Sequence, residues 1–427
     1  MTQKYFFSLV CFFFFFLYDA ESLWFYFMSH FDLDTYNYDL PPELVAQLAV
    51  KPAHDARLLI VQDSIDSITH TSFFSLDKHV SPNAVFILNN SRVLRSRFVL
   101  KNQEIIYNGT KGIISKWEIF FLRYVDSNSF EALIQPGNKF RVGTFLEFAG
   151  LSVEVLSITE TGRVLRVLQW SISHAMEAYW ELPLPPYIEY TKQKEEDYQT
   201  NFATKPWSVA APTASLHFSE ELLQKLPQQK LFVTLHVGLG TFKWIQESDI
   251  RNYMIHKEEV EVDISLFQTI AELKISERPI VAVWTTVCRT LESLPYVWNC
   301  FSEHERTTFF SSETQKFWNN LKIYKNSYIA SYAIENSNVI FECQLYITPD
   351  FHFQIIDELI TNFHLPKSSL LVLVSSFLWI DAIKKIYQIA IKEKYRFFSF
   401  WDGMYIKKWK SFQSIGNDTS KIDTDNI

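Results

Sequence analysis

The chain has 427 residues, of which 48% are hydrophobic and 21% charged, and its formal net charge is −8. This balance is that of a globular protein with one large core or two modest ones, and it excludes a chain that is disordered throughout. The acidic total argues against indiscriminate nucleic-acid binding, although a local basic groove remains compatible with it. The four cysteines, Cys11, Cys288, Cys300 and Cys343, have no paired spacing. That disfavours a zinc site or a disulfide framework and fits a reducing cytosol.

The first 27 residues resemble a secretory leader, because an apolar stretch at 5–18 follows Lys4. This stretch is shorter than the roughly 20 apolar residues that a membrane span needs, and its centre is a low-complexity run of five phenylalanines. We therefore interpret residues 1–27 as a non-native upstream extension, with Met28 as the initiator, and expect no membrane association. The alternative, a secreted or membrane-anchored protein, depends on residues 1–27 alone.

Apolar runs at 58–61 and 85–88 predict buried strands. From 94 to 175 the segments are short, partly alternating and broken by Gly, Asn or Ser, which is typical of a small antiparallel barrel or sandwich. Beyond 176, a helix at 219–226 with Ser219 as its cap precedes a strand at 232–236. A helix at 264–275 and a buried strand at 280–283 follow, and a strongly apolar segment at 370–377 precedes a helix at 382–395.

Strands that alternate with helices indicate a mixed α/β fold. We predict a discontinuous α/β catalytic domain (28–93 and 176–410), an inserted small antiparallel β-barrel domain (94–175) and a polar tail (411–427). Residues 295–343 are rich in Ser, Asn, Glu and aromatic residues without clear periodicity, so we expect a divergent surface insertion or a decayed segment there.

Three runs, at 209–218, 234–242 and 361–369, each place a histidine beside hydroxyl or amide side chains and a turn former. Gly238 and Gly240, in the second run, allow backbone torsions and close approach that larger residues forbid. Such loops, repeated in one chain, favour a site assembled from several loops. No dinucleotide-binding or P-loop fingerprint is present, which argues against the commonest nucleotide-binding designs.

Further motifs lie at 89–93 (NNSRV), 182–188 (LPLPPYI), 285–293 (TTVCRTLES) and 393–399 (EKYRFFS). Together and in this order, the motifs resemble the S-adenosylmethionine:tRNA ribosyltransferase-isomerase family of the queuosine pathway, from about residue 28 to residue 409. The resemblance implies the same α/β architecture with an inserted barrel.

The resemblance also implies a reaction. The ribosyl portion of S-adenosylmethionine, a co-substrate, moves to 7-aminomethyl-7-deazaguanine at the tRNA wobble position and is isomerised. The product is epoxyqueuosine in tRNA, adenine and methionine leave, and no metal is expected. A base must take a proton from the methylene beside the sulfonium, the aminomethyl nucleophile must be neutral, and adenine needs a proton donor. Histidines and carboxylates with pKa values near neutrality suit such work.

The predicted catalytic residues are His217, His236, His364, Glu292 and Asp402. The predicted substrate-binding residues are Arg92, Thr213, Gly238, Gly240, Thr241, Thr285, Thr286, Arg289 and Asn362. Each histidine could instead be a satisfied, half-buried residue, each threonine a turn or cap, and each arginine a surface ion pair. The residues alone do not assign the individual acid and base.

The predicted RNA-binding residues are Lys384, Lys385, Lys394, Arg396 and Tyr395, where cations could follow phosphates and the aromatic ring could stack on a base. The alternative is a solvated basic helix face with core aromatics behind it. We expect the partner to be a tRNA with a queuosine-type anticodon, the protein to be a monomer, and the location to be the cytoplasm.

The chain departs from the family pattern at five positions where that pattern has glycine: Trp207, Ser215, Trp284, Asp350 and Trp401. A side chain there is tolerable if the backbone φ is ordinary and costly if φ is positive. We therefore expect reduced activity with the fold kept. The alternative is a catalytically impaired relative that only binds tRNA or S-adenosylmethionine.

Overall fold

The structure, a computed structural model, describes residues 29–408 except 63, 149–150, 160–161, 170, 185–187, 189, 239–243, 324–328, 399 and 401. The segments interpreted as an upstream extension and a polar tail, and the predicted site residues Gly240 and Thr241, lie outside the described residues. The chain divides into unit 1 (Met1–Asn89, Thr213–Val233 and Phe242–Ile427) and unit 2 (Asn90–Pro212 and Thr234–Thr241). Unit 2 extends beyond the inserted domain expected at 94–175.

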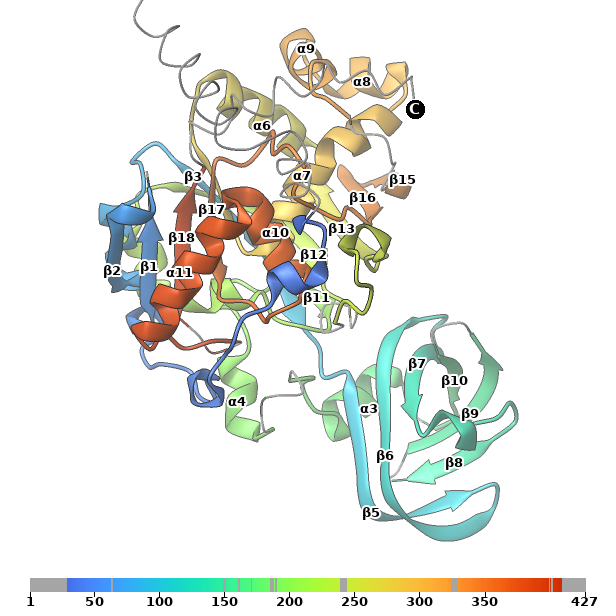
Figure 1. The fold of residues 1–427 in the computed structure, drawn as a ribbon. Coiled ribbons are helices and arrows are strands. Elements are labelled where there is room, and N and C mark those ends of the chain that lie inside the picture. Colours follow the sequence, from blue (N-terminus) through green and yellow to red (C-terminus); the bar gives the residue numbers. More distant parts are fainter. Residues whose placement is uncertain are drawn as a thin grey trace, which may run out of the picture. The chain divides into compact units, whose positions relative to one another are not determined.

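Unit 1 is built on a sheet with the strand order β15-β16-β13-β12-β3-β14-β17-β18-β1-β2 (Figure 1). Its central strands β12, β3, β14 and β17 run parallel, and β18 pairs antiparallel with β17. Every residue of β3 and β14 is buried, as expected for parallel strands covered on both faces. The strands are β1 (Arg57–Val61), β2 (Ile68–Ser72), β3 (Val85–Asn89), β12 (Gln229–His236), β13 (Glu258–Asp263), β14 (Ile280–Val283), β15 (Ile329–Glu335), β16 (Asn338–Cys343), β17 (Glu358–Asn362) and β18 (Gly403–Lys407).

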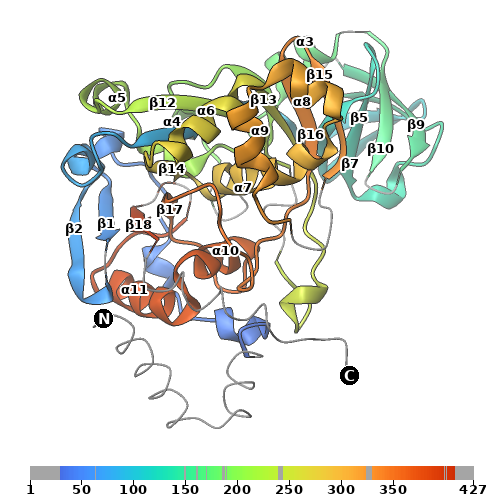
Figure 2. The same ribbon diagram turned by 90° about the horizontal axis from the view of Figure 1, so that it is seen from above.

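The helices of unit 1 begin at serine caps in several places. The Ser219 hydroxyl accepts the Leu222 amide at the start of α5, and Ser368 caps α10 in the same way through Leu371. Figure 2 shows α10 and α11 side by side against the sheet. The α-helices are α5 (Glu220–Lys225), α6 (Ser265–Ile275), α7 (Thr285–Cys300), α8 (Glu303–Phe309), α9 (Ser312–Asn319), α10 (Ser369–Leu378) and α11 (Ile380–Lys392). Short 3₁₀ helices are η1 (Leu33–Tyr36), η2 (Pro42–Leu44), η3 (Ala53–Asp55), η4 (Ile65–Ser67), η5 (Phe73–Lys78), η7 (Thr213–His217) and η9 (Ile250–Asn252).

The segment 295–343, expected to be a surface insertion, contains regular elements that pack within unit 1. It contains the end of α7, then α8 and α9, and the strands β15 and β16 of the main sheet. Although the sequence of this segment has no clear periodicity, its aromatic residues pack against one another. Trp298 and Trp318 stack with ring centroids 6.0 Å apart, and Phe310 packs on Trp298 at 5.0 Å. The segment is therefore ordered and packed, and its being an insertion stays a prediction.

In unit 2, six strands pair antiparallel in the order β10-β7-β6-β5-β8-β9, and the order closes on itself (Figure 1). Alternate residues point inward and form a core that includes Phe121, Phe130 and Trp180. The ring consists of β5 (Arg97–Tyr107), β6 (Thr110–Tyr124), β7 (Ser129–Gln135), β8 (Phe145–Phe148), β9 (Leu151–Ile158) and β10 (Arg163–Val167). The rest of unit 2 includes β4 (Ser91–Val93), η6 (Gly137–Lys139), α3 (Ile172–Tyr179), α4 (Lys192–Asp197) and β11 (Lys205–Ser208).

The mixed α/β class is confirmed. The strands expected at 58–61, 85–88, 232–236 and 280–283 correspond to β1, β3, β12 and β14, and the expected helices correspond to α5, α6 and α11. The apolar segment at 370–377 is α10. No helix among the described residues is long and apolar enough to cross a bilayer.

Candidate functional site

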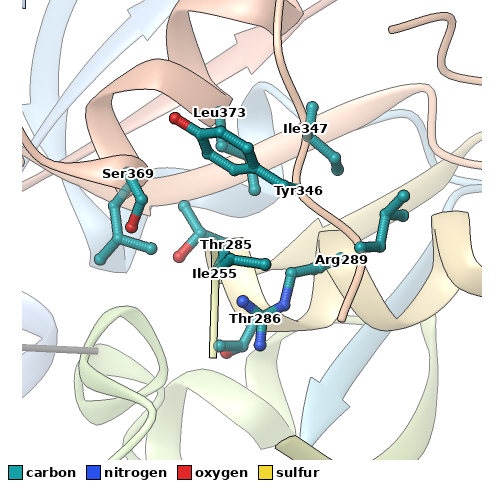
Figure 3. A pocket seen from close by; sticks show the side chains of 10 residues that line it. Ile255, Thr285, Thr286, Arg289, Tyr346, Ile347, Ser369 and Leu373 are labelled. Atoms are coloured by element: carbon teal, nitrogen blue, oxygen red, sulfur yellow. The ribbon is translucent and has the colours of Figure 1, made fainter. Parts of the chain in front are cut away.

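A pocket in unit 1 lies at the start of α7, directly after strand β14. Its lining residues surround about 270 Å³ of empty space, part of which is open solvent. Figure 3 shows Thr285, Thr286 and Arg289 extending from α7, with Tyr346 and Ser369 on other segments around the same space. Its remaining lining is apolar: Ile255, Leu345, Ile347, Leu370 and Leu373.

Several polar atoms that line this pocket are buried without a hydrogen-bond partner among the described residues. They are the hydroxyls of Thr285, Thr286 and Tyr346 and Nε of Arg289. Thr285 is 0% exposed and Thr286 is 3% exposed, so the cost of leaving these groups unpaired is not relieved by bulk water. Native proteins satisfy the great majority of buried polar groups, so a cluster of exceptions around one pocket indicates a place where a polar ligand binds.

The charge of Arg289 is balanced inside the protein. Its Nη2 donates to Glu258 Oε2, and His256 Nε2 lies 3.1 Å from Glu258 Oε1. Glu258 is buried on β13 and fixes the guanidinium. We did not predict Glu258 from the sequence. A signal was present, because the period of two in β13 places Glu258 on the same buried face as Val260 and Val262.

A second group of predicted residues meets at the end of β17. Thr213 Oγ1 donates to Asn362 Oδ1 at 2.8 Å, and the Asn362 side-chain nitrogen is buried without a partner among the described residues. His364 Nε2 lies 2.8 Å from Thr361 Oγ1, and the His364 amide donates to Tyr387 Oη at 2.8 Å. Burial lowers the pKa of His364 to about 3, so its imidazole is neutral at neutral pH.

His217 ends η7 and stacks on Phe73, with ring centroids 4.4 Å apart. Its Nδ1 lies 3.3 Å from the Ala53 carbonyl oxygen. Since a carbonyl can only accept, Nδ1 carries the proton and Nε2 presents a lone pair. Nε2 is buried without a partner among the described residues. Burial lowers the pKa of His217 to about 4, against the opposing charge of Asp402. The imidazole is therefore neutral at neutral pH, and Nε2 is its proton-accepting atom, but burial makes it a weaker base than an ordinary histidine.

The two predicted catalytic carboxylates are occupied by structural hydrogen bonds. Glu292 Oε1 accepts the amides of Ile355 and Ile356 at 3.0 and 2.9 Å, and Oε2 accepts the Gln354 amide at 2.9 Å. Burial raises the pKa of Glu292, although these amides oppose the shift. Asp402 accepts the amides of Arg57 and Arg396 and the Arg396 guanidinium, at 2.8–2.9 Å. Both carboxylates hold loops in place.

The other predicted residues are distributed as follows. In unit 2, Arg92 is exposed on β4, and His236 and Gly238 are half-buried at and after the end of β12. The structure therefore brings Thr285, Thr286 and Arg289 together at the pocket, and Thr213, Asn362 and His364 together at the end of β17. It places the predicted residues Arg92, His236 and Gly238 in the other unit.

The predicted RNA-binding residues differ in exposure. Lys385 and Lys394 are exposed and Lys384 is half-buried on α11, whereas Arg396 is paired with Asp402. Tyr395 is 0% exposed, its hydroxyl bonds His70 Nδ1 at 2.8 Å, and the Arg57 guanidinium lies 3.8 Å from its ring centre. A ring enclosed in this way cannot stack on a base, so the role predicted for Tyr395 is corrected to a core one.

Comparisons with known proteins agree with this picture. The family model described as "Queuosine biosynthesis protein" matches residues 33–406. The chain belongs to this family. It is 34% identical to the S-adenosylmethionine:tRNA ribosyltransferase-isomerase of Thermosynechococcus vestitus, covering 88% of this chain and 96% of that protein. It is 36% identical to the enzyme of the same name from a Hydrogenobaculum species, covering 88% and 99%. A crystal structure of the Thermotoga maritima S-adenosylmethionine tRNA ribosyltransferase is 27% identical, covers 88% and 99%, and gives a TM-score of 0.44. The family resemblance read from the motifs is thereby confirmed.

Proposed function

We propose that this chain is an S-adenosylmethionine:tRNA ribosyltransferase-isomerase. It transfers and isomerises the ribosyl portion of S-adenosylmethionine onto 7-aminomethyl-7-deazaguanine in a tRNA, with release of adenine and methionine. The observation that carries this proposal is the identity of 34–36% over 88% of the chain to proteins of that name. The wobble position of a queuosine-type anticodon, a monomeric state and a cytoplasmic location are part of the same proposal.

We assign the pocket at the start of α7 to a polar portion of S-adenosylmethionine. The methionine carboxylate suits this place, because the first amides of a helix and its dipole favour an anion. The hydroxyls of Thr285 and Thr286 and Nε of Arg289 would donate to it, and each lacks another partner among the described residues. The apolar lining from Ile255, Leu345 and Leu373 would cover the methylenes of the ligand.

His217 is our candidate for the base that takes the proton beside the sulfonium. Its Nδ1–H is fixed by the Ala53 carbonyl, so the free lone pair lies on Nε2. Asp402 and Glu292 position loops through backbone amides and do not themselves move protons in this proposal. Thr213 and Asn362 form a hydrogen-bonded pair whose spare side-chain N–H could bind a substrate hydroxyl.

We also propose that the closed antiparallel ring of β5–β10 is the inserted β-barrel domain expected at 94–175. Its strands lie between Arg97 and Val167, inside those limits. The remaining described residues would form the α/β catalytic domain. On the RNA side, Lys384, Lys385, Lys394 and Arg396 remain candidates for contact with tRNA phosphates.

The test is incubation of the protein, started at Met28, with S-adenosylmethionine and tRNA that carries 7-aminomethyl-7-deazaguanine. We expect free adenine and a mass gain on the modified base, with methyl-group label recovered in methionine. Methyl label in the RNA would indicate a methyltransferase instead. Retained tRNA binding without either product would favour the impaired, binding-only relative.

The assignment of His217 is tested by His217→Gln. Loss of a general base lowers kcat by about 10²–10⁴-fold, whereas His364→Gln, which removes a ring already bonded to Thr361, should have a smaller effect on kcat. Equal activity of wild type and His217→Gln would remove His217 from the mechanism.

A further inference from the structure

Two tryptophans have backbone torsions that are almost confined to glycine. Trp284, between β14 and α7, has φ 93° and ψ 149°, and Trp379, between α10 and α11, has φ 70° and ψ 141°. In this region the β carbon of an L-residue collides with its own backbone, and a non-glycine residue costs about 1–3 kcal/mol. By contrast, Ser215 and Asp350, for which the resemblance implies glycine as it does for Trp284, do not have positive φ.

The surrounding hydrogen bonds require these torsions. The Trp284 amide donates to the Ile360 carbonyl on β17 at 2.7 Å, and its own carbonyl accepts the Cys288 amide as α7 begins. The Trp379 carbonyl likewise accepts the Ile383 amide at the first turn of α11. Each residue therefore turns the chain sharply into a helix. That is a task for which glycine is the default residue.

Other tryptophans of the chain occupy ordinary positions and use their rings. Trp298 and Trp318 are helical, 0% and 2% exposed, and their indole N–H groups donate to Asn319 Oδ1 and to the Phe267 carbonyl, both at 2.9 Å. These are sites built for an indole. The chain thus contains tryptophans whose indole N–H is bonded inside a helix region, and two tryptophans whose backbone torsions favour glycine. Of these two, Trp379 also makes an edge-to-face contact with His30, with ring centroids 6.4 Å apart.

The composition shows the same imbalance. The chain has 12 tryptophans and only 10 glycines, whereas average usage of about 7% would give roughly 30 glycines in a chain of this length. Glycine is therefore scarce in the same chain that has tryptophan at two backbone positions suited to glycine.

We propose that positions 284 and 379 are glycine in the functional protein, because the codons behind these tryptophans are translated as glycine in the cell that makes it. UGG specifies tryptophan, whereas the meaning of UGA differs between genetic codes and includes both tryptophan and glycine. On this proposal the codons for 284 and 379 are UGA, and those for Trp298 and Trp318 are UGG.

This substitution also bears on the pocket. Position 284 immediately precedes Thr285 and Thr286, the first residues of α7, which line the pocket. Glycine there provides the required turn without strain and without a ring beside the substrate-binding helix terminus. The expected reduction in activity would then belong to the tryptophan form alone.

The deciding measurement is peptide mass spectrometry of the protein isolated from its own cells, with the gene sequenced alongside. We expect glycine at 284 and 379, tryptophan at 298 and 318, and UGA and UGG codons respectively. Tryptophan in native peptides at 284 and 379, or UGG codons there, overturns the proposal. This readout does not depend on activity, so its result is separable from that of the ribosyl-transfer assay.

Stability is the supporting measurement, and position 379 is the informative one. Trp379 is half-buried, so Trp379→Gly should keep or raise the melting temperature. The matched control Trp318→Gly removes a buried, hydrogen-bonded ring from a helix and should lower it strongly. A comparable loss in both variants contradicts the proposal. Trp284 is 3% exposed, so relief of strain and loss of ring contacts oppose each other there.

Discussion

A substitution at Glu292 can distinguish a catalytic role, which the sequence predicts, from a structural role, which its hydrogen bonds indicate. In Glu292→Gln, the remaining oxygen can still accept the Ile355 and Ile356 amides, but the new NH₂ group cannot accept the Gln354 amide. One hydrogen bond to a charged acceptor is lost, which is worth about 1.5–3 kcal/mol. Burial disfavours the charged form of Glu292 and so raises its pKa, and the neutral glutamine does not bear this cost. The net loss of unfolding free energy should therefore lie at the lower end of that range.

The assay compares hydrogen exchange with turnover in the full chain. We expect faster exchange of the amides at 354–356, a lower unfolding midpoint in urea, and a kcat close to that of the wild type. Glu303→Gln, at an exposed residue of α8, is the matched control and should change none of these. The reasoning would be refuted by a fall in kcat of about 10²–10⁴-fold, typical of a lost general acid or base, with unchanged protection at 354–356.

Three further predictions concern charge and hydrogen bonding. Because the folded pKa values of His217 and His364 are lowered to about 4 and 3, the unfolded chain binds more protons below pH 6.5; stability should fall as pH drops from 6.5 towards 4, by up to about 1.4 kcal/mol per pH unit for each histidine. Urea titrations at several pH values should show that the unfolding free energy of His364→Gln changes less with pH than that of the wild type. An unchanged pH dependence would contradict the burial argument. Thr285→Val removes a buried, unpaired hydroxyl, so the variant should be as stable as the wild type or more stable. Loss of one hydrogen bond to the ligand should raise the KM for S-adenosylmethionine by about 2–13-fold. An unchanged KM would exclude contact between Thr285 and that substrate. Lys385→Glu should raise the KM for tRNA and should weaken the salt dependence of tRNA binding by about one phosphate contact. The control Lys316→Glu on α9 should change neither. Equal effects of the two substitutions would point to net charge alone.

The sequence could predict those elements whose signal is local. The apolar runs of β3 and β14 and the serine that caps α5 act within a few residues, and the structure follows them. The segment 295–343 was not predictable in this way. Its order depends on the contact between Trp298 and Trp318, which belong to different helices and share no sequence period.

The candidate site divides in the same manner. Thr285, Thr286 and Arg289 were predicted and lie around one pocket, because their motif starts a helix directly after a buried strand. Tyr346 was missed, since it lies in an irregular segment after β16 where no periodicity indicates orientation. Tyr395 was misjudged because a basic helix face and the aromatic core behind it have the same composition in sequence.

Burial of a polar side chain is therefore a weaker sign of function than its unused bonding capacity. Glu292 and Asp402 are both buried, and backbone amides or a guanidinium already occupy their oxygens. Thr285, Thr286 and His217 are equally enclosed, yet each retains a hydroxyl or a ring nitrogen without a partner among the described residues. An unpaired buried group costs stability unless a ligand or a water completes it. Such groups also occur elsewhere in the chain, for example at Ser96 and Ser375, so unused bonding capacity supports the proposed roles of the α7 threonines and His217 only together with the pocket and the family.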